Sequence, residues 1–194
     1  MSKNFLGPLI LIVGNSGSGK DSIISGVIEK YPSHLKQLYA PKRYITRPPS
    51  KHEKNISLTQ EEFKKMELEG KFTLKWHIYG LDYGISFEIE NWLKKGHPVI
   101  INVSRTLIKE AKEKYKNVKV VFIEVPFEIT YQRIKDRKRE SEHLLNERIE
   151  RAKNNQKFPE ADFIVDNSGK LNDAINCLLD YIISIVSNFE KESN

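Results

Sequence analysis

A glycine-rich run between an apolar segment and a helix-like segment constrains this chain more than any other feature. Residues 9–13 are all apolar, and the run 14–22 that follows reads GNSGSGKDS. Isoleucine and valine then recur at helical spacing over 22–30. Glycines allow tight turns and a close approach of the backbone to a ligand. A strand, a glycine loop and a helix in this order direct backbone N–H groups at one point, which predicts a phosphate-binding loop.

Lys20 indicates that the phosphate belongs to a nucleotide. A lysine at this spacing supplies a point charge for the outer phosphates of a nucleoside triphosphate. The alternative is a glycine-rich turn that binds no ligand, and the lysine between a strand and a helix argues against it. The residues expected to hold the nucleotide are Gly14, Asn15, Ser16, Gly17, Ser18, Gly19, Lys20, Asp21 and Ser22.

The residue after Lys20 departs from the general phosphate-loop pattern. A serine or threonine, whose hydroxyl ligates magnesium, is usual there, but this chain has Asp21, and Ser22 comes one place later. A carboxylate is a good ligand for a hard cation. Asp21 could therefore bind Mg²⁺ directly, bind it through water, or act as an acidic charge at the start of the helix. We favour the water-mediated contact and keep Asp21 and Ser22 as the two candidate metal ligands.

The composition narrows the classes of partner. The 194 residues suit one domain, and 32 basic against 26 acidic side chains give a net charge of +6. Such an excess suits acidic small molecules and nucleic acids alike. The aromatic residues lie within hydrophobic runs and do not alternate with a basic stripe, so we expect no nucleic-acid partner.

Other features argue against a membrane or secreted protein. The apolar run near the N-terminus is too short for a membrane span. No cleavage signal follows a basic region and a hydrophobic core, so we expect a cytoplasmic protein. Cys177 has no second cysteine with which to form an intrachain disulfide, and we expect it to be a small core residue.

Apolar segments that alternate with helical ones predict a three-layer α/β fold with a parallel sheet covered on both faces. The expected strands are 9–13, 98–103, 118–125 and 163–165, and the expected helices are 22–30, 59–69, 86–95, 105–115, 128–137 and 171–186. Residues 71–85 indicate two short strands around a turn, 40–54 an exposed loop or edge segment, and 136–157 a solvated helical face or hairpin. Residues 1–194 are expected to form a single domain.

Several segments in this order resemble the nucleoside-monophosphate kinases, most closely the guanylate kinases. More narrowly, they resemble the ribose 1,5-bisphosphate phosphokinases, which make phosphoribosyl pyrophosphate from ATP. The matching segments are 14–22, 43–48 (RYITRP), Trp76-His77, Gly80-Leu81 with Tyr83-Gly84, and 102–105 (NVSR). The sequence Lys-Asp-Ser at 20–22, unusual for phosphate loops in general, is typical of the narrower family.

The resemblance implies a P-loop kinase that uses ATP and Mg²⁺, with an acceptor-binding insertion at about 41–90 and a lid at about 136–157. Lys20 and magnesium would hold the β- and γ-phosphates. Arg137 and Arg148 match the lid arginines that close over the transferring group, which makes them, with Lys20, the expected catalytic residues. Arg133, Arg139 and Arg151 are competing candidates, and Asn167 matches a position near adenine.

A contrast with the guanylate kinases predicts a different acceptor. Their glutamate that reads the guanine edge corresponds to Lys75 here, and a serine that assists it corresponds to Ile85. Lysine presents only hydrogen-bond donors, so base recognition is expected to be lost and positive charge gained. The residues expected to bind a small acceptor with two phosphates are Arg43, Arg47, Lys75, His77, Tyr83 and Arg105.

The resemblance therefore implies ATP-dependent phosphorylation of a small phosphorylated sugar, ribose 1,5-bisphosphate, and suggests a place in phosphonate breakdown. A phosphate acceptor is already anionic, so no general base is required. The alternatives are a guanylate or other nucleoside-monophosphate kinase and a guanylate-kinase-like interaction module without activity. The intact Gly19-Lys20 argues against the module. The oligomeric state stays open.

Overall fold

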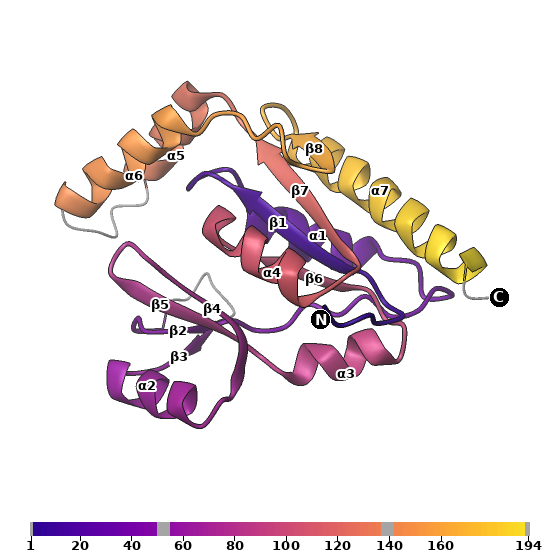
Figure 1. The fold of residues 1–194 in the computed structure, drawn as a ribbon. Helices are drawn as coiled ribbons and strands as arrows, with labels where there is room; N and C mark the ends of the chain where they lie inside the picture. The colour runs from indigo at the N-terminus through magenta and orange to yellow at the C-terminus, as the bar shows by residue number, and fades with distance from the viewer. Residues whose placement is uncertain (1, 50–54, 137–141, 193–194) are drawn as a thin grey trace.

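A four-stranded parallel sheet forms the centre of the protein (Figure 1). The computed structural model describes residues 2–49, 55–136 and 142–192. The strand order is β6-β1-β7-β8, with every neighbouring pair parallel. The strands are β1 (Leu9–Gly14), β6 (Val99–Asn102), β7 (Val118–Glu124) and β8 (Phe163–Asp166). All four lie where the sequence predicts strands.

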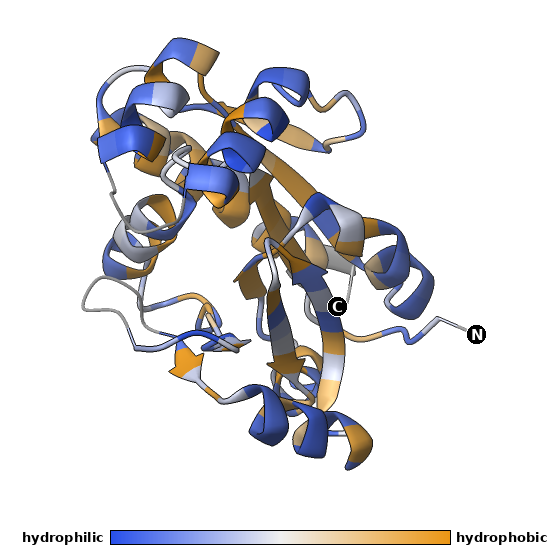
Figure 2. Cartoon of the chain, turned by 90° about the vertical axis from the view of Figure 1, so that its left-hand side faces the viewer, coloured by the Kyte–Doolittle hydropathy of each residue, from blue (hydrophilic) through white to orange (hydrophobic). Residues whose placement is uncertain are grey.

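Helices cover both faces of this sheet, as the alternating pattern predicts. Successive residues of β1 point to opposite faces: Leu9 and Leu11 pack toward α3 (Glu88–Lys94) and α4 (Ile108–Lys114), and Ile10 packs toward the opposite helices. Those opposite helices are α1 (Lys20–Lys30) and α7 (Leu171–Glu192). The strands are therefore hydrophobic on both faces, whereas the outer faces of the helices are hydrophilic (Figure 2). The three-layer α/β fold is confirmed.

A second, mostly antiparallel sheet of order β3-β2-β5-β4 lies beside the first (Figure 1). Its elements are β2 (Tyr44–Ile45), β3 (Ile56–Ser57), α2 (Gln60–Leu68), β4 (Phe72–Ile78) and β5 (Leu81–Ser86). The hairpin of β4 and β5 is the predicted pair of strands. The prediction for 40–54 was wrong in part: Tyr44–Ile45 is an inner strand between β3 and β5, because the prolines at 41, 48 and 49 flank it rather than interrupt it.

Local capping signals place α2 as predicted. The hydroxyl of Thr59 accepts a hydrogen bond from the backbone N–H of Glu62 at 3.1 Å, and the backbone N–H of Thr59 donates to Glu62 Oε2 at 2.7 Å. This reciprocal pair is a capping box, which satisfies two backbone donors at the start of the helix. The helix in turn stacks Phe63 on Phe72 and so packs against the second sheet.

Two helices stand at the carboxyl end of the parallel sheet (Figure 1). They are α5 (Phe127–Asp136) and α6 (Glu142–Asn154), which pack against each other. The charged segment 136–157 is thus mainly one helix in the part that the structure describes. A 3-10 turn, Arg105–Leu107, leads into α4.

The last helix corrects one expectation. Cys177 is exposed rather than part of the core. The buried face of α7 carries Ala174, Ile175, Leu178 and Ile182, and a residue at 177 falls on the adjacent face of the helix. In the described part of the chain, no helix is both long and apolar enough to cross a membrane.

Candidate functional site

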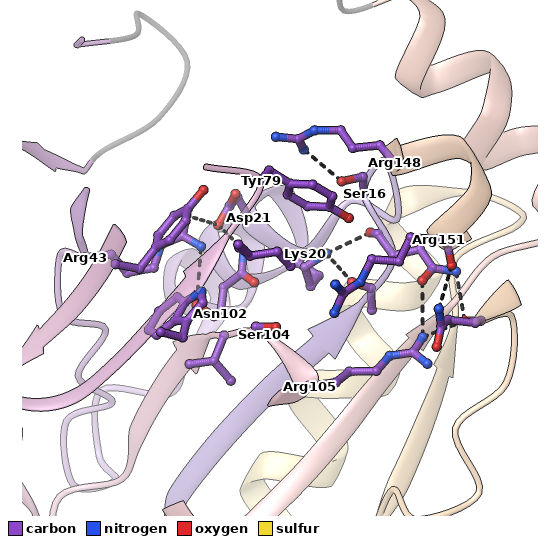
Figure 3. Close-up of a pocket in the computed structure, with 18 of the residues that line it drawn as sticks. Ser16, Lys20, Asp21, Arg43, Tyr79, Asn102, Ser104, Arg105, Arg148 and Arg151 are labelled. Atoms are coloured by element: carbon purple, nitrogen blue, oxygen red, sulfur yellow. Dashed lines mark hydrogen bonds and ion pairs between the residues drawn. The ribbon is translucent and has the colours of Figure 1, made fainter. Parts of the chain in front are cut away.

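A pocket opens at the carboxyl ends of β1 and β6, where ligands bind in open α/β sheets. Three parts of the chain enclose it: the loop between β1 and α1, the tip of the β4–β5 hairpin, and α6 (Figure 3). Loop residues Gly14–Gly17 and Gly19–Asp21 line it, opposite Arg148 and Arg151 of α6. Segments far apart in the sequence therefore meet around the predicted phosphate loop.

The loop has the backbone that a phosphate cradle needs. Gly17 and Gly19 have φ angles of 81° and 86°, a left-handed conformation that favours glycine. A Cβ atom at Gly19 would lie 2.5 Å from Asn167 Nδ2, so a side chain there would also clash. Gly19 caps α1 without a side-chain hydrogen bond. The helix N-terminus therefore presents its backbone N–H groups and positive dipole to the pocket.

Lys20 lies inside this loop. Its Nζ donates to the backbone oxygens of Gly14 and Asn15, both at 2.8 Å, and to Ser18 Oγ at 3.3 Å. These bonds hold a positive charge at the centre of the loop, at the position predicted for contact with the outer phosphates.

Asp21 is paired with a cation from the second sheet (Figure 3). Asp21 Oδ1 accepts from Asn102 Nδ2 at 2.8 Å and from Arg43 Nη2 at 3.2 Å. Arg43 also donates to the backbone oxygen of Asn102 at 3.3 Å and to Asn55 Oδ1 at 3.2 Å. The charge of Asp21 beside the phosphate loop is thus offset by Arg43. The same contacts connect α1, β6 and the segment before β2.

Arg105 connects the phosphate loop with the end of α6. Its Nη2 donates to the backbone oxygen of Asn155 at 2.6 Å and to Asn15 Oδ1 at 3.3 Å. The guanidinium also lies 4.6 Å from the Phe122 ring centre and 5.2 Å from that of Phe158. Burial lowers the pKa of Arg105, and the nearby charge of Arg151 lowers it further. Arg105 lines the pocket, but its contacts hold the loop and helix together.

Of the predicted lid arginines, Arg148 reaches the phosphate loop. Its Nη1 donates to Ser16 Oγ at 2.9 Å, and Arg151 follows on the same face of α6 and lines the pocket. Arg133 on α5 instead donates to the backbone oxygen of Gly17 at 3.3 Å. Arg137 and Arg139 lie outside the described residues.

On the opposite wall, Arg47 and Tyr83 line the pocket as predicted for acceptor-binding residues. The ring of Tyr83 stacks on Trp76, with 5.0 Å between centroids and 5° between planes. Trp76 is largely buried, so it is both a core residue and a wall of the pocket. The stack gives this side of the pocket a flat, rigid surface.

Lys75 and His77 are not brought to this pocket. They alternate with Trp76 along β4 and so point to the other face of the strand, toward α2. Lys75 pairs there with Glu67, and His77 Nδ1 lies 2.7 Å from Asp82 Oδ1. A depression beside α2 contains both residues, together with Gln60 and Phe63.

Two further predicted residues lie away from the pocket wall. Asn167 is 3% exposed and donates from Nδ2 to the backbone oxygen of Ser18 at 2.8 Å, so it supports the phosphate loop from below. Ser22 is exposed on α1 and is not among the residues that line the pocket.

Some pocket residues were not predicted from the sequence. Asn102 and Ser104 line the pocket at the end of β6. The sequence singled them out only as part of the matching segment 102–105, and the rule that ligands bind at the carboxyl ends of parallel strands could have indicated their role. The backbone oxygen of Asn155 accepts a hydrogen bond from Asn15 Nδ2 at 2.9 Å. No sequence pattern indicates this contact. Tyr79, at the hairpin tip, carries one signal only, its place before Gly80 in a two-residue turn.

The fold and the pocket together define a P-loop phosphotransferase. A family model for guanylate kinases matches residues 7–185. A guanylate kinase from Anaplasma phagocytophilum superposes with a TM-score of 0.67 at 14% identity, covering 93% of this chain and 87% of that one. At this identity the likeness shows the fold alone.

Sequence relatives identify the branch of this class. The ribose 1,5-bisphosphate phosphokinase PhnN of Pectobacterium atrosepticum is 39% identical over 166 residues, covering 84% of this chain and 87% of the relative. The corresponding protein of Thiobacillus denitrificans is 38% identical over 148 residues, covering 76% of this chain and 77% of the relative. The chain belongs to the guanylate-kinase-like P-loop kinases and, within them, to the ribose 1,5-bisphosphate phosphokinase family.

Proposed function

We propose that this protein transfers the γ-phosphoryl group of ATP to the 1-phosphate of ribose 1,5-bisphosphate, forming 5-phospho-D-ribose 1-diphosphate. The charge of the pocket is the observation that carries the proposal. Against one carboxylate, that of Asp21, the described lining residues include the basic side chains of Lys20, Arg43, Arg47, Arg105, Arg148 and Arg151. Such a pocket suits two densely charged substrates, and the names of the sequence relatives specify the acceptor.

The phosphate loop holds the triphosphate of ATP. Backbone N–H groups of the loop and of the α1 N-terminus surround the β-phosphate, and Lys20 contacts the β- and γ-phosphates. Segment 41–90 contributes the acceptor side of the pocket, and segment 136–157, which contains Arg148, acts as the lid. Asn167 acts beneath the loop, where its bond to Ser18 fixes the loop backbone.

The residues present fit Mg²⁺ as a co-substrate ion. The Asp21 side chain lines the pocket and is 54% exposed, so a carboxylate oxygen is accessible to a hydrated ion. No group of three or more His, Cys, Asp or Glu side chains suitable for a metal occurs among the residues the structure describes. The single accessible carboxylate of Asp21 fits Mg²⁺, which proteins usually hold with one or two carboxylates and the substrate phosphates. When bound, the ion neutralises charge on the β- and γ-phosphates.

The transfer itself needs positioning rather than a base. An oxygen of the acceptor 1-phosphate, anionic at neutral pH, attacks the γ-phosphorus, and the bond from that phosphorus to the β–γ bridging oxygen breaks to release ADP. Arg47 orients the acceptor through bidentate contact with a phosphate. Arg148, already bonded to Ser16, stabilises the charge spread over the transferring group.

The pocket is poorly suited to recognise guanine. The ring N–H and the amino group of guanine require a hydrogen-bond acceptor, and the single lining carboxylate, that of Asp21, belongs to the phosphate loop and the start of α1. Ile85 is fully buried and apolar. Burying these guanine donors without a partner costs about 1–3 kcal/mol each, so GMP should be a very poor substrate.

An assay of ADP release tests the proposal. Purified protein receives ATP and Mg²⁺ with ribose 1,5-bisphosphate, with GMP, or with no acceptor. We expect rapid turnover of ATP only when ribose 1,5-bisphosphate is the acceptor. Turnover of GMP without turnover of the bisphosphate would restore the nucleotide-kinase alternative, and no turnover above background with any acceptor would support the non-catalytic module.

A further inference from the structure

Tyr79 occupies an unfavourable backbone conformation at the edge of the pocket. It is the one non-glycine residue with positive φ in the described ranges, at 54°, and Gly80 follows at 69°. The paired residues Ile78 and Leu81 flank this two-residue loop. Two central residues with positive φ are typical of a type I′ turn, in which asparagine followed by glycine is strongly preferred. A tyrosine at the first position is therefore costly for the turn itself.

The side chain of Tyr79 contacts the lid helix. The guanidinium carbon of Arg148 lies 4.2 Å from the centre of the tyrosine ring, and that of Arg151 lies 5.8 Å from it. A guanidinium at this distance from an aromatic face is held by cation–π attraction. Arg148 donates at the same time to Ser16 Oγ at 2.9 Å. Figure 3 shows the Tyr79 ring close to Arg148 and Ser16.

The hydroxyl of Tyr79 stays neutral at this position. Burial raises the pKa of Tyr79, and the charges of Arg151 and Arg148, together with a hydrogen bond between the hydroxyl and Ser16, oppose the rise without cancelling it. The residue therefore contributes an uncharged aromatic face, not an anion, to the basic pocket.

We propose that Tyr79 is a positioning residue for phosphoryl transfer: its ring holds Arg148 over the phosphate loop and so connects the acceptor hairpin with the lid. This inference rests on the proposed function of the pocket. The ring fixes a long, flexible side chain in the place where charge develops, and preorganised donors contribute most to transition-state stabilisation. The unfavourable backbone conformation of Tyr79 is then the energetic cost of placing its ring beside Arg148.

Tyr79→Asn distinguishes the role of residue 79 in the turn from its role in holding Arg148. Asparagine suits the turn better than tyrosine, so the melting temperature should stay the same or rise. Turnover at saturating substrates should fall by roughly 3- to 30-fold, the range expected for loss of a cation–π contact, with little change in the Michaelis constant for ATP. Tyr79→Phe keeps the ring and should retain turnover within about twofold.

A double-mutant cycle gives the decisive comparison. In an Arg148→Ala background, Tyr79→Asn should cause little further loss, because the arginine that the ring positions over the phosphate loop is then absent. The same loss in both backgrounds would overturn the proposal, as would higher turnover of Tyr79→Asn, which would mean that the ring obstructs the site. A fall in melting temperature that parallels the loss of turnover would show a merely structural residue. These ratios are measured with whichever acceptor the wild-type protein phosphorylates, so failure of the bisphosphate assay and failure of the Tyr79 proposal remain distinct.

Discussion

Asp21 illustrates how a single residue changes the electrostatics of a phosphate loop. Where most such loops carry a hydroxyl, this one carries a carboxylate that Arg43 and Asn102 hold at 3.2 and 2.8 Å. The ion pair keeps the negative charge from repelling the phosphates, and it also determines where Arg43 points. Arg43 is therefore held by Asp21, and we propose that Arg47, which also lines the pocket, is the acceptor-binding cation of this segment.

Lys20→Ala tests the nucleotide site at the same scale. The variant should fold normally but lose turnover by roughly 10²-fold or more, the scale of losing one preorganised electrostatic contact. Steady-state rates and melting temperatures measured together check this. Lys109→Ala, which removes an exposed lysine of α4, is the matched control. Unchanged turnover in a well-folded Lys20→Ala protein would remove the assignment of the ATP site.

Arg47→Ala tests the acceptor site. Because Arg47 lines the pocket opposite the phosphate loop, its loss should raise the Michaelis constant for the bisphosphate by about tenfold or more while that for ATP changes little. A charge-assisted hydrogen bond worth about 1.5–3 kcal/mol sets this scale. Lys42→Ala removes an exposed cation of the same segment and should change neither constant. A larger effect on ATP than on the bisphosphate would place Arg47 on the nucleotide side.

At the scale of elements, α6 and the β4–β5 hairpin matter because they bring distant residues to one loop. The sequence predicts the hairpin from a turn between β-rich segments, and it predicts a solvated helical face or a hairpin in the charged region where α6 lies. It does not predict the face that each presents. Strand alternation on β4 turns Trp76 toward the pocket and Lys75 toward α2, so Lys75 lies away from the acceptor pocket for which it was predicted.

Arg148→Ala should reduce turnover far more than ATP affinity. A lid arginine acts mainly on charge that develops in the transition state, and such a residue is worth on the order of 10³–10⁵ in rate in related phosphoryl transfers. Measurements of equilibrium ATP binding and of turnover on the same samples distinguish the effect on affinity from the effect on rate. Lys153→Ala, an exposed position of the same helix, serves as control. A large loss of ATP binding with normal turnover at saturation would contradict the lid role; Arg137→Ala is expected to behave as Arg148→Ala does.

Substitution of Glu90 on α3 tests how this helix is held against the two sheets. Its carboxylate accepts from Lys3 Nζ at 2.7 Å, from Tyr115 Oη at 2.9 Å and from Thr73 Oγ1 at 3.0 Å. Glu90→Gln should lower the free energy of unfolding by about 1–3 kcal/mol near pH 7, because buried partners lose a charged acceptor. Denaturant unfolding measures this, with exposed Glu113→Gln as control.

The pH dependence of that effect has a definite sign. Burial alone would raise the pKa of Glu90, but hydrogen bonds from Lys3, Tyr115 and Thr73 outweigh it and hold the pKa below its ordinary value. The stabilisation is therefore complete above the unfolded pKa of about 4.3 and is lost as the pH falls through the folded pKa. The difference between wild type and Glu90→Gln should shrink below about pH 4. A difference that grows there would contradict this account.

At the scale of the whole molecule, the sequence predicts what is local and misses what depends on packing. The phosphate loop, the α2 capping box and the buried parallel strands follow from short patterns, and the fold and the family are confirmed. The support of the loop by Asn167, the pairing of Arg43 with Asp21 and the contact of Arg148 with Tyr79 join residues more than twenty positions apart. Such contacts arise from the arrangement of the elements. The prediction that Cys177 is a core residue was wrong because a shift of one position along a helix moves a side chain from the buried face to the exposed one.

The identity of the reaction product tests the central claim most directly. Phosphorus NMR of a mixture of protein, ATP, Mg²⁺ and ribose 1,5-bisphosphate distinguishes a phosphate monoester from a diphosphate, because the two phosphorus atoms of a diphosphate couple to each other. We expect the 1-phosphate signal to be replaced by a coupled diphosphate pair on ribose, with one ADP formed for each bisphosphate consumed. An unchanged 1-phosphate signal, with inorganic phosphate as the product from ATP or with GDP formed from added GMP, would contradict the claim.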